Sequence, residues 1–130
     1  KSSASATKWV ERRKFNSVKE CYDKLHDEGY RIYATHLGKN SKSLYDLNLT
    51  KKVALVFGNE HHGVSDEASE LADGNLQIPM VGMIQSLNVS VACAVTLYEA
   101  MRQRIGKGSY NKPKYKKQEL EKLFSEWSKK

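Results

Sequence analysis

The sequence predicts an α/β domain built on a mostly parallel sheet with flanking helices. Two observations carry this prediction. Short apolar runs alternate with amphipathic stretches along most of the 130 residues. One of these runs, VALVF at 53–57, is continuously apolar, which is typical of a strand covered on both faces. Sheets of this class bind their ligands at the carboxyl ends of the strands.

A first helix is predicted between Ser17 and Gly29. Ser17 and Glu20 have the spacing of a capping box, in which each side chain accepts a hydrogen bond from the other residue's backbone N–H. Gly29 is the expected stop, because glycine readily adopts the left-handed conformation that follows many helices. The apolar residues in between recur at helical spacing: Val18, Cys21, Tyr22 and Leu25.

Strands are expected on either side of this helix. Residues 10–15 are a strand candidate despite their charges, and residues 31–36 form a strand with Ile32 and Ala34 on one face. The polar residues 38–51 are expected to form a loop that leads into the apolar run.

The middle of the chain is predicted to contain short elements. A turn at 58–63 precedes a short helix that begins after Ser65, where two acidic residues suit the positive end of the helix. A brief strand at 76–78 ends at a proline, and a loop follows at 79–86.

Two more helices are predicted towards the C-terminus. Residues 87–104 are apolar nearly all round up to Tyr98, so the first half of this helix is expected to be buried. Residues 117–128 are amphipathic, with one apolar stripe made of Leu120, Leu123, Phe124 and Trp127.

Composition narrows the class of protein. No window approaches the ~20 apolar residues of a membrane span, and no signal segment is recognisable. Cys21 and Cys93 fit no metal or redox spacing and are expected to be buried, reduced thiols. These features predict a cytoplasmic protein without a metal site or a membrane partner. Because the chain starts with Lys1 and not methionine, we expect it to be a fragment of a longer protein.

The net positive charge lies at one end of the chain. Residues 1–101 hold 12 basic and 12 acidic residues, whereas residues 102–130 hold 10 and 3, which accounts for the net charge of +7. Tyr110 and Tyr115 lie within the basic run. This combination suits RNA phosphates and base stacking, although a solvated polar tail is the alternative. The basic residues concerned are Arg102, Arg104, Lys107, Lys112, Lys114, Lys116 and Lys117.

The predicted strand ends carry the most unusual residues. The segments 58–60 and 78–80 follow two strands, and Gly58, Gly63 and Gly82 allow the backbone to approach a ligand closely. Neither GxxxxGK[ST] nor GxGxxG occurs, so an ATP or NAD site is not expected.

Two longer motifs resemble a known family. FGNEHHGVS at 57–65 and IPMVGMIQSLNVSVACAVTLYEAMRQR at 78–104 are similar to the second and third motifs of SpoU-type RNA 2′-O-ribose methyltransferases, in the SPOUT superfamily. The opening KSSASATKWV resembles the segment that follows the first motif. The continuation MRQRIGKGSY and the tail LEKLFSEW look most like the tRNA guanosine branch of the family, TrmH.

The resemblance implies a fold, an activity and an assembly. Residues 1–105 would be the C-terminal part of a SPOUT domain that contains a deep trefoil knot and lacks its first strand and helix. Residues 106–130 would be a basic extension with an amphipathic helix. The family transfers a methyl group from S-adenosylmethionine to a ribose 2′-hydroxyl of RNA. The likeness to the TrmH branch implies that the methylated nucleotide is a guanosine of tRNA. It works as a homodimer, with the long C-terminal helix in the interface.

The resemblance also assigns site residues. The catalytic candidates are Glu60, Asn88 and Ser86, although a turn acid and a helix cap are the structural alternatives for Glu60 and Asn88. His61 and His62 are expected to be exposed turn residues. Trp9 and Trp127 are expected to pack within the protein. The residues that would line the cofactor pocket are Thr35, Phe57, Gly58, Ile78, Met80 and Leu87, with Ser86 close by.

One expected residue is not in the sequence. The family assigns removal of the hydroxyl proton to an arginine of the first motif, and Arg12 and Arg13 lie past the place where it would fall. The chain alone is therefore expected to be inactive. The alternatives left open are methylation of ribosomal RNA and a non-catalytic remnant that binds RNA or the cofactor.

Overall fold

The computed structural model describes residues 9–83 and 86–129. They fall into two compact units: Asn16–Ser109, and the described residues on either side of it. The prediction of domains at 1–105 and 106–130 remains a prediction. The elements of the first unit are α2 (Val18–Asp27), β1 (Arg31–Thr35), β2 (Lys42–Ser43), the 3-10 helix η1 (Leu44–Asp46), β3 (Val53–Val56), α3 (Asp66–Leu71), β4 (Gly74–Gln77) and α4 (Val89–Gly106).

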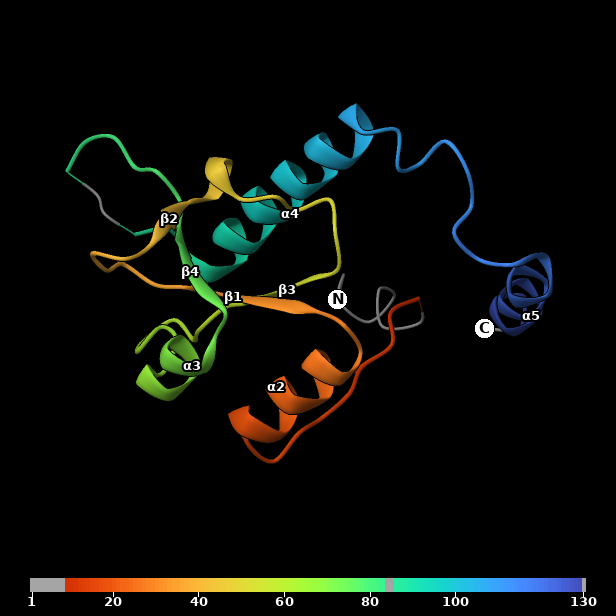
Figure 1. The fold of residues 1–130 in the computed structure, drawn as a ribbon, viewed down its shortest axis with the longest axis horizontal. Coiled ribbons are helices and arrows are strands. Elements are labelled where there is room, and N and C mark those ends of the chain that lie inside the picture. The colour runs from red at the N-terminus through yellow and green to blue at the C-terminus, as the bar shows by residue number, and fades with distance from the viewer. Residues whose placement is uncertain (1–8, 84–85, 130) are drawn as a thin grey trace. The chain divides into compact units, whose positions relative to one another are not determined.

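The first unit is built on a four-stranded sheet in the order β2-β4-β1-β3 (Figure 1). All three strand pairs are parallel, which confirms the predicted α/β class. Ala34 of β1 pairs with Val56 of β3, and Thr35 pairs with Leu76 of β4. The strands therefore end at a common edge. The trefoil knot remains a prediction.

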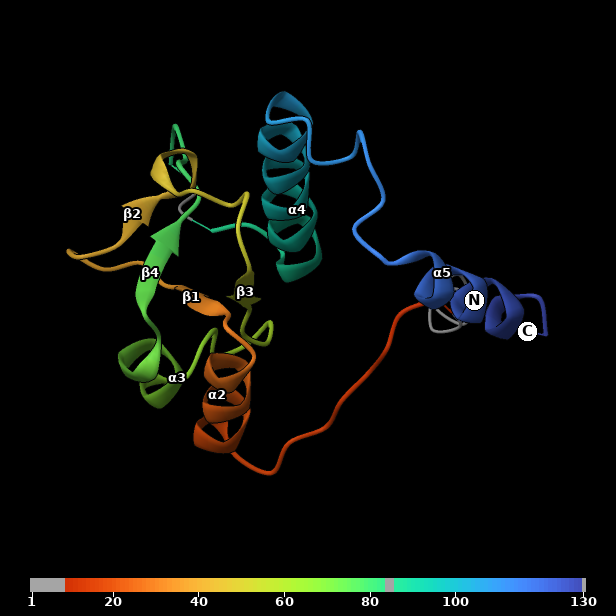
Figure 2. The ribbon, with the colours of Figure 1, turned by 45° about the vertical axis from the view of Figure 1, so that its right-hand side comes forward.

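Each face of the sheet is covered by its own apolar cluster. On one face, Leu44, Leu47, Leu49 and Leu76 pack with Ala100 of α4. On the other face, residues of β1 and β3 pack against α2 and α3, and Figures 1 and 2 show these helices opposite α4. Successive side chains of a strand point to opposite faces, so β1 and β3 contribute to both clusters, whereas β4 contributes Leu76 to the first. The second cluster is centred on Tyr22, Ile32 and Ala68.

Helix α2 begins and ends where the sequence predicted. The Ser17 hydroxyl accepts a hydrogen bond from the Glu20 N–H at 3.1 Å, and Gly29 has the positive φ of 84° expected after a helix. The capping box differs in one detail. The Glu20 carboxylate accepts from the N–H of Asn16 at 3.3 Å, one residue before the cap.

Two expectations for the strands and loops were wrong. Residues 10–15 form no strand. The supposed loop at 38–51 contains β2 and η1, and it contributes three buried leucines to the core.

The two-sided cover expected for β3 is present, since Val53 and Leu55 pack against one cluster and Ala54 and Val56 against the other, although the edge position leaves the strand half-buried. Strand β4 begins earlier than predicted, at Gly74.

Helix α4 is less buried than its composition suggested. Only Thr96, Glu99 and Ala100 are buried along its length, and Val91 and Leu97 are 48% and 54% exposed. The expectation of a buried first half is therefore wrong for a single chain. Among the described residues, no helix is both long and apolar enough to cross a membrane.

The second unit contains α5 (Lys117–Trp127) and the described residues before Asn16. Trp9 packs edge-on against Trp127 with 5.5 Å between ring centroids, as the packing role predicted. Phe124 also meets Trp127 edge-on and is 61% exposed. In the first unit, Cys21 and Cys93 form no disulfide, and they are half-buried and not buried as expected.

Candidate functional site

A cavity of about 410 Å³ lies at the carboxyl ends of the strands. Thr35 is the last residue of β1, Phe57 and Gly58 follow β3 directly, and Ile78 follows β4. Because parallel strands end at the same edge of a sheet, segments far apart in sequence meet here. The N-terminal turn of α4 closes another side of the cavity, through Val89.

This cavity collects every residue that the sequence assigned to a cofactor pocket. The assignments came from separate motifs, up to about 50 residues apart, so their convergence was not guaranteed by spacing alone. The Thr35 hydroxyl donates to the carbonyl of Val56 at 3.0 Å, which fixes its orientation across the sheet. The assigned residues that line the cavity are Thr35, Phe57, Gly58, Ile78, Met80, Ser86 and Leu87.

The turn after β3 requires glycine at Gly58. A Cβ atom at this position would lie 1.8 Å from the carbonyl carbon of Gly63, which is far inside van der Waals contact. The turn is closed by Asn59, whose side chain accepts from the backbone N–H groups of His61 and His62 at 3.0 and 2.7 Å. This wall of the cavity is therefore built from a tightly folded backbone.

The three catalytic candidates lie in different surroundings. Ser86 lines the cavity. Glu60 is exposed on the turn and is not among the described lining residues. Asn88 is the N-cap of α4, and its side-chain oxygen accepts from the Ser90 N–H at 2.9 Å. That contact matches the structural alternative for Asn88.

The lining also contains residues outside the predicted cofactor set. His62 was expected to be a plain turn residue; it is exposed and also lines the cavity. Asp66 was taken only as a favourable acid at the start of α3. Most of the other lining residues lie next to the ends of strands, and this position in the sequence could have identified them. No Lys or Arg occurs in the described part of the lining. The additional lining residues are His36, Leu37, Asn59, His62, Gly63, Val64, Asp66, Leu76, Gln77, Val89 and Ala92.

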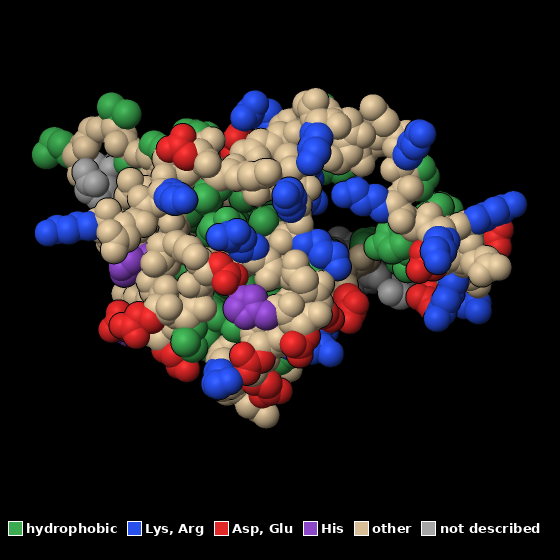
Figure 3. Space-filling view, viewed as in Figure 1, with side chains coloured by type: hydrophobic (Ala, Val, Ile, Leu, Met, Phe, Trp, Pro, Cys, Tyr) green, Lys and Arg blue, Asp and Glu red, His purple; other side chains and the backbone are tan. Residues whose placement is uncertain are grey.

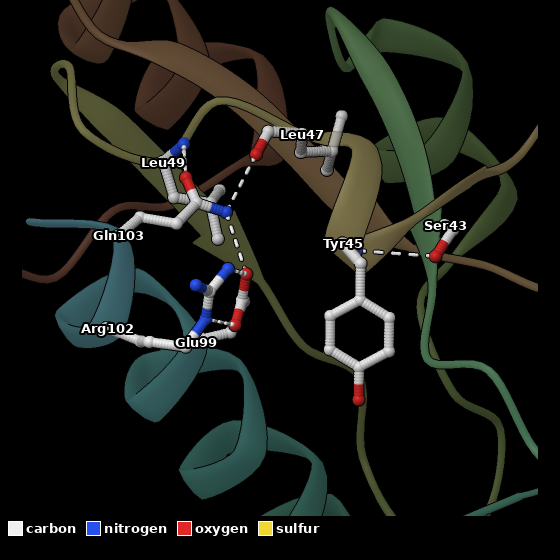
Figure 4. A network of polar contacts seen from close by, with 7 residues as sticks. All are labelled: Ser43, Tyr45, Leu47, Leu49, Glu99, Arg102 and Gln103. Atoms are coloured by element: carbon white, nitrogen blue, oxygen red, sulfur yellow. Dashed lines mark hydrogen bonds and ion pairs between the residues drawn. The ribbon is translucent and has the colours of Figure 1, made fainter. Parts of the chain in front are cut away.

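The predicted RNA-binding residues on α4 are engaged within the chain. Arg102 forms a two-pronged pair with the buried carboxylate of Glu99, with both N–O distances 2.8 Å (Figure 4). Hydrogen bonds from Arg102 and Gln103 lower the pKa of Glu99 to about 2. Glu99 therefore stays ionised and offsets the Arg102 charge at neutral pH.

Gln103 joins the same network to the segment 47–51, which precedes β3. Its amide nitrogen donates to the carbonyl of Leu47 at 2.9 Å, and its amide oxygen accepts from the N–H of Leu49 at 2.8 Å (Figure 4). One side chain thus satisfies two backbone groups of an otherwise irregular segment.

Lys107 directly follows α4 in the first unit and is exposed, and the remaining basic candidates lie in the second unit. All of them are exposed, and so are Tyr110 and Tyr115. The backbone N–H of Lys116 donates to the Glu119 carboxylate at 2.7 Å at the start of α5. The four side chains concerned are Lys112, Lys114, Lys116 and Lys117.

The chain has clear relatives among characterised proteins. The tRNA (guanosine(18)-2′-O)-methyltransferase of Thermus thermophilus is 42% identical over 128 residues, which cover 98% of this chain and 66% of that protein. The enzyme of the same name from Aquifex aeolicus is 43% identical over 121 residues, covering 93% and 57%. The chain thus spans between 57% and 66% of the length of these two relatives.

Solved structures agree with the sequence relatives. The crystal structure of the A. aeolicus TrmH/SpoU tRNA modifying enzyme matches with a TM-score of 0.84 and 43% identity, over 92% of this chain and 61% of that one. The SpoU methyltransferase AviRb from Streptomyces viridochromogenes, in complex with the cofactor AdoMet, matches with a TM-score of 0.63 and 32% identity, over 69% and 37%. The family model described as SpoU rRNA Methylase matches residues 1–98. Three kinds of comparison thus agree, and the chain belongs to the SpoU methylase family.

Proposed function

We propose that this chain provides the cofactor-binding part of an S-adenosylmethionine-dependent tRNA guanosine 2′-O-methyltransferase that works in the cytoplasm. The observation that carries the proposal is the single cavity that gathers the residues of both motifs at the carboxyl ends of β1, β3 and β4. The names of the most similar relatives support tRNA guanosine as the substrate.

The cavity suits S-adenosylmethionine in size and in charge. Its volume of about 410 Å³ is in the range of small-molecule sites, and most of its walls are apolar. The cofactor carries a positive sulfonium and an amino-acid group, so its net charge is positive. A lining that contains the carboxylate of Asp66 and, among described residues, no Lys or Arg favours such a ligand over a phosphate ester.

The chain contributes binding and orientation to the reaction. S-adenosylmethionine, when bound, supplies a methyl group that is already activated on sulfur. The tightly folded turn at Gly58 and the apolar side chains of Ile78 and Leu87 fix the ligand and exclude water from it. Ser86 lies at the cavity wall, where its hydroxyl can hydrogen-bond a polar group of the ligand or of the ribose. Asn88 acts as a positioning residue, since it caps α4 beside the site.

We also propose that α4 forms a two-fold homodimer interface. Four of its exposed large apolar residues recur at intervals of seven, three and four, which places them on one stripe. Tyr98 is 69% exposed and Ile105 59% exposed, which is unusual for large side chains on a packed helix. Tyr98→Lys should shift the protein from dimer to monomer in sedimentation at micromolar concentration, whereas a wild-type protein that is already monomeric would contradict the interface. The stripe consists of Val91, Tyr98, Met101 and Ile105.

The basic tail is proposed to bind tRNA phosphates. Each neutralised phosphate contributes about 0.7 to 0.9 to the slope of log affinity against log salt. Replacing Lys112, Lys114, Lys116 and Lys117 by Ser should therefore flatten the slope and weaken tRNA binding, without changing cofactor affinity. An unchanged slope would mean that these lysines stay solvated.

The decisive test is methyl transfer by the full-length protein. Radiolabelled S-adenosylmethionine is supplied with tRNA transcripts or with 23S rRNA fragments, and the labelled nucleoside is identified after digestion. Labelled 2′-O-methylguanosine from tRNA supports the proposal. Label confined to rRNA supports the alternative substrate, and absence of transfer to either RNA contradicts the enzymatic proposal. A tRNA in which the modified guanosine is replaced by 2′-deoxyguanosine is the matched control.

A further inference from the structure

A cationic patch lies at the other end of the sheet, where the segment 47–51 meets the end of α4. Arg104 donates from its guanidinium to the carbonyl of Lys51 at 3.1 Å. One turn later, the ammonium of Lys107 donates to the hydroxyl of Thr50 at 3.3 Å. These contacts hold Lys51 and Lys107 on neighbouring backbone segments, so their positions are set by the fold.

No carboxylate neutralises these two lysines in the part of the chain that the structure describes. The ion pairs found there join Lys19 to Asp23, His26 to Asp73 and Arg102 to Glu99. Lys51 and Lys107 are both exposed. Figure 3 shows Lys and Arg side chains over the end of α4 and the adjoining segment, whereas many Asp and Glu side chains lie over α2 and α3.

A third cation extends the patch. Lys52 follows Lys51 directly, and its ammonium donates to the carbonyl of Glu28 at 3.0 Å. The same ammonium lies 5.4 Å from the centre of the Tyr30 ring. We call Lys51, Lys52 and Lys107 the far patch. All three lysines are exposed, and a polyanion that contacts several of them gains from their combined charge.

The far patch is well separated from the cavity. Helix α4 starts at Val89, which lines the cavity, and its last residue is Gly106, next to Lys107. Its 18 residues correspond to a length of about 27 Å at about 1.5 Å per residue. A nucleotide bound at the cavity therefore cannot reach the patch. A folded RNA has a phosphate backbone that is long enough to reach both places.

We propose that the far patch binds the phosphate backbone of an RNA segment remote from the methylated nucleotide. That the RNA is tRNA rests on the proposed function. The far patch adds a second binding place, so that a large folded RNA contacts the protein at two separated sites. The competing explanation is that the lysines only offset the partial negative charge at the C-terminal end of α4.

The test uses the full-length protein and a double variant, Lys51→Gln with Lys107→Gln. Loss of two phosphate contacts should lower the slope of log affinity against log salt for tRNA by about 1.4 to 1.8. Affinity for a short oligonucleotide that carries the target guanosine should not change, because it cannot span the distance. The matched control, Lys19→Gln with Lys24→Gln, removes the same charge from α2 and should leave the tRNA slope unchanged.

Each outcome decides the inference. An unchanged tRNA slope in the double variant overturns it, and a slope change of equal size in the α2 control also overturns it. A variant that loses thermal stability but keeps the slope supports the helix-end explanation. Methylation separates the two proposals. If the wild type methylates tRNA but the slope is unchanged, only the far patch fails. If the slope falls but no methyl group is transferred, only the proposed enzymatic function fails.

Discussion

At the carboxyl ends of the strands, the chain forms a cavity with mostly apolar walls, one carboxylate and a turn so tight that Gly58 has no room for a Cβ atom. At the amino end of β3, by contrast, the surface carries the consecutive lysines Lys51 and Lys52, and the backbone just before them is hydrogen-bonded to Gln103 and Arg104 of α4. The first arrangement suits a small ligand recognised by shape. The second suits a polyanion recognised by charge, so salt and steric changes should affect the two ends differently.

The largest expected effect is steric and confined to the cavity. Gly58→Ala places a methyl group 1.8 Å from the backbone of Gly63, so the turn must open. Affinity for S-adenosylmethionine should fall at least about 100-fold, equivalent to about 2.7 kcal/mol. Gly106→Ala is the matched control, because a Cβ there meets nothing within 4 Å and alanine favours the helix. Equal cofactor affinity in Gly58→Ala and the wild type, measured by calorimetry, would remove this turn from the binding site.

The second-largest expected effect concerns the hydrogen bonds by which Gln103 of α4 holds the segment 47–51. Gln103→Leu leaves the Leu47 carbonyl and the Leu49 N–H without their partner. Buried groups left unpaired are costly, so the free energy of unfolding should fall by about 2 kcal/mol. Gln118→Leu, on the exposed side of α5, is the control and should change stability by under about 0.5 kcal/mol. If urea unfolding gives the same value for both variants, the segment 47–51 is not held by Gln103.

The smallest effect appears only in acid. Hydrogen bonds from Arg102 and Gln103 lower the pKa of Glu99 from 4.5 to about 2 in the folded protein. Stability from this group is therefore fully present above about pH 4.5 and is lost as the pH falls towards 2. Glu99→Gln should be less stable than the wild type at neutral pH, and the difference should narrow over this window. Parallel pH profiles for the two proteins would contradict the ionised network.

The sequence predicted the cavity better than the core. Gly58, Ile78 and Leu87 were assigned from motifs whose glycines and prolines also mark the ends of strands, so the signal for element boundaries and for the site was the same. The burial of the leucines at 44, 47 and 49 was not predicted, because polar residues separate them and the segment therefore shows neither a helical nor a strand pattern. Burial of such a segment depends on a partner far along the chain.

The predicted burial of helix α4 was wrong for a different reason. An apolar composition predicts contact with something, but it does not say whether the partner lies in the same chain. Val91 and Tyr98 are exposed here, as a helix that meets a second copy would require. The role of Gln103 could not be predicted either, because nothing in the sequence indicates that a helical glutamine forms hydrogen bonds with the backbone of residues 47–49.

We propose above all that the cavity at the strand ends holds S-adenosylmethionine. The most direct test is calorimetric titration of the full-length protein and of Leu87→Trp with S-adenosylmethionine and with its demethylated product. We expect micromolar binding of both ligands to the wild type and none to the variant, because the indole fills space now lined by Leu87. The variant should keep the unfolding temperature of the wild type and its binding to tRNA at low salt. Equal binding of S-adenosylmethionine by the two proteins, or no binding by the wild type at millimolar ligand, would contradict this proposal.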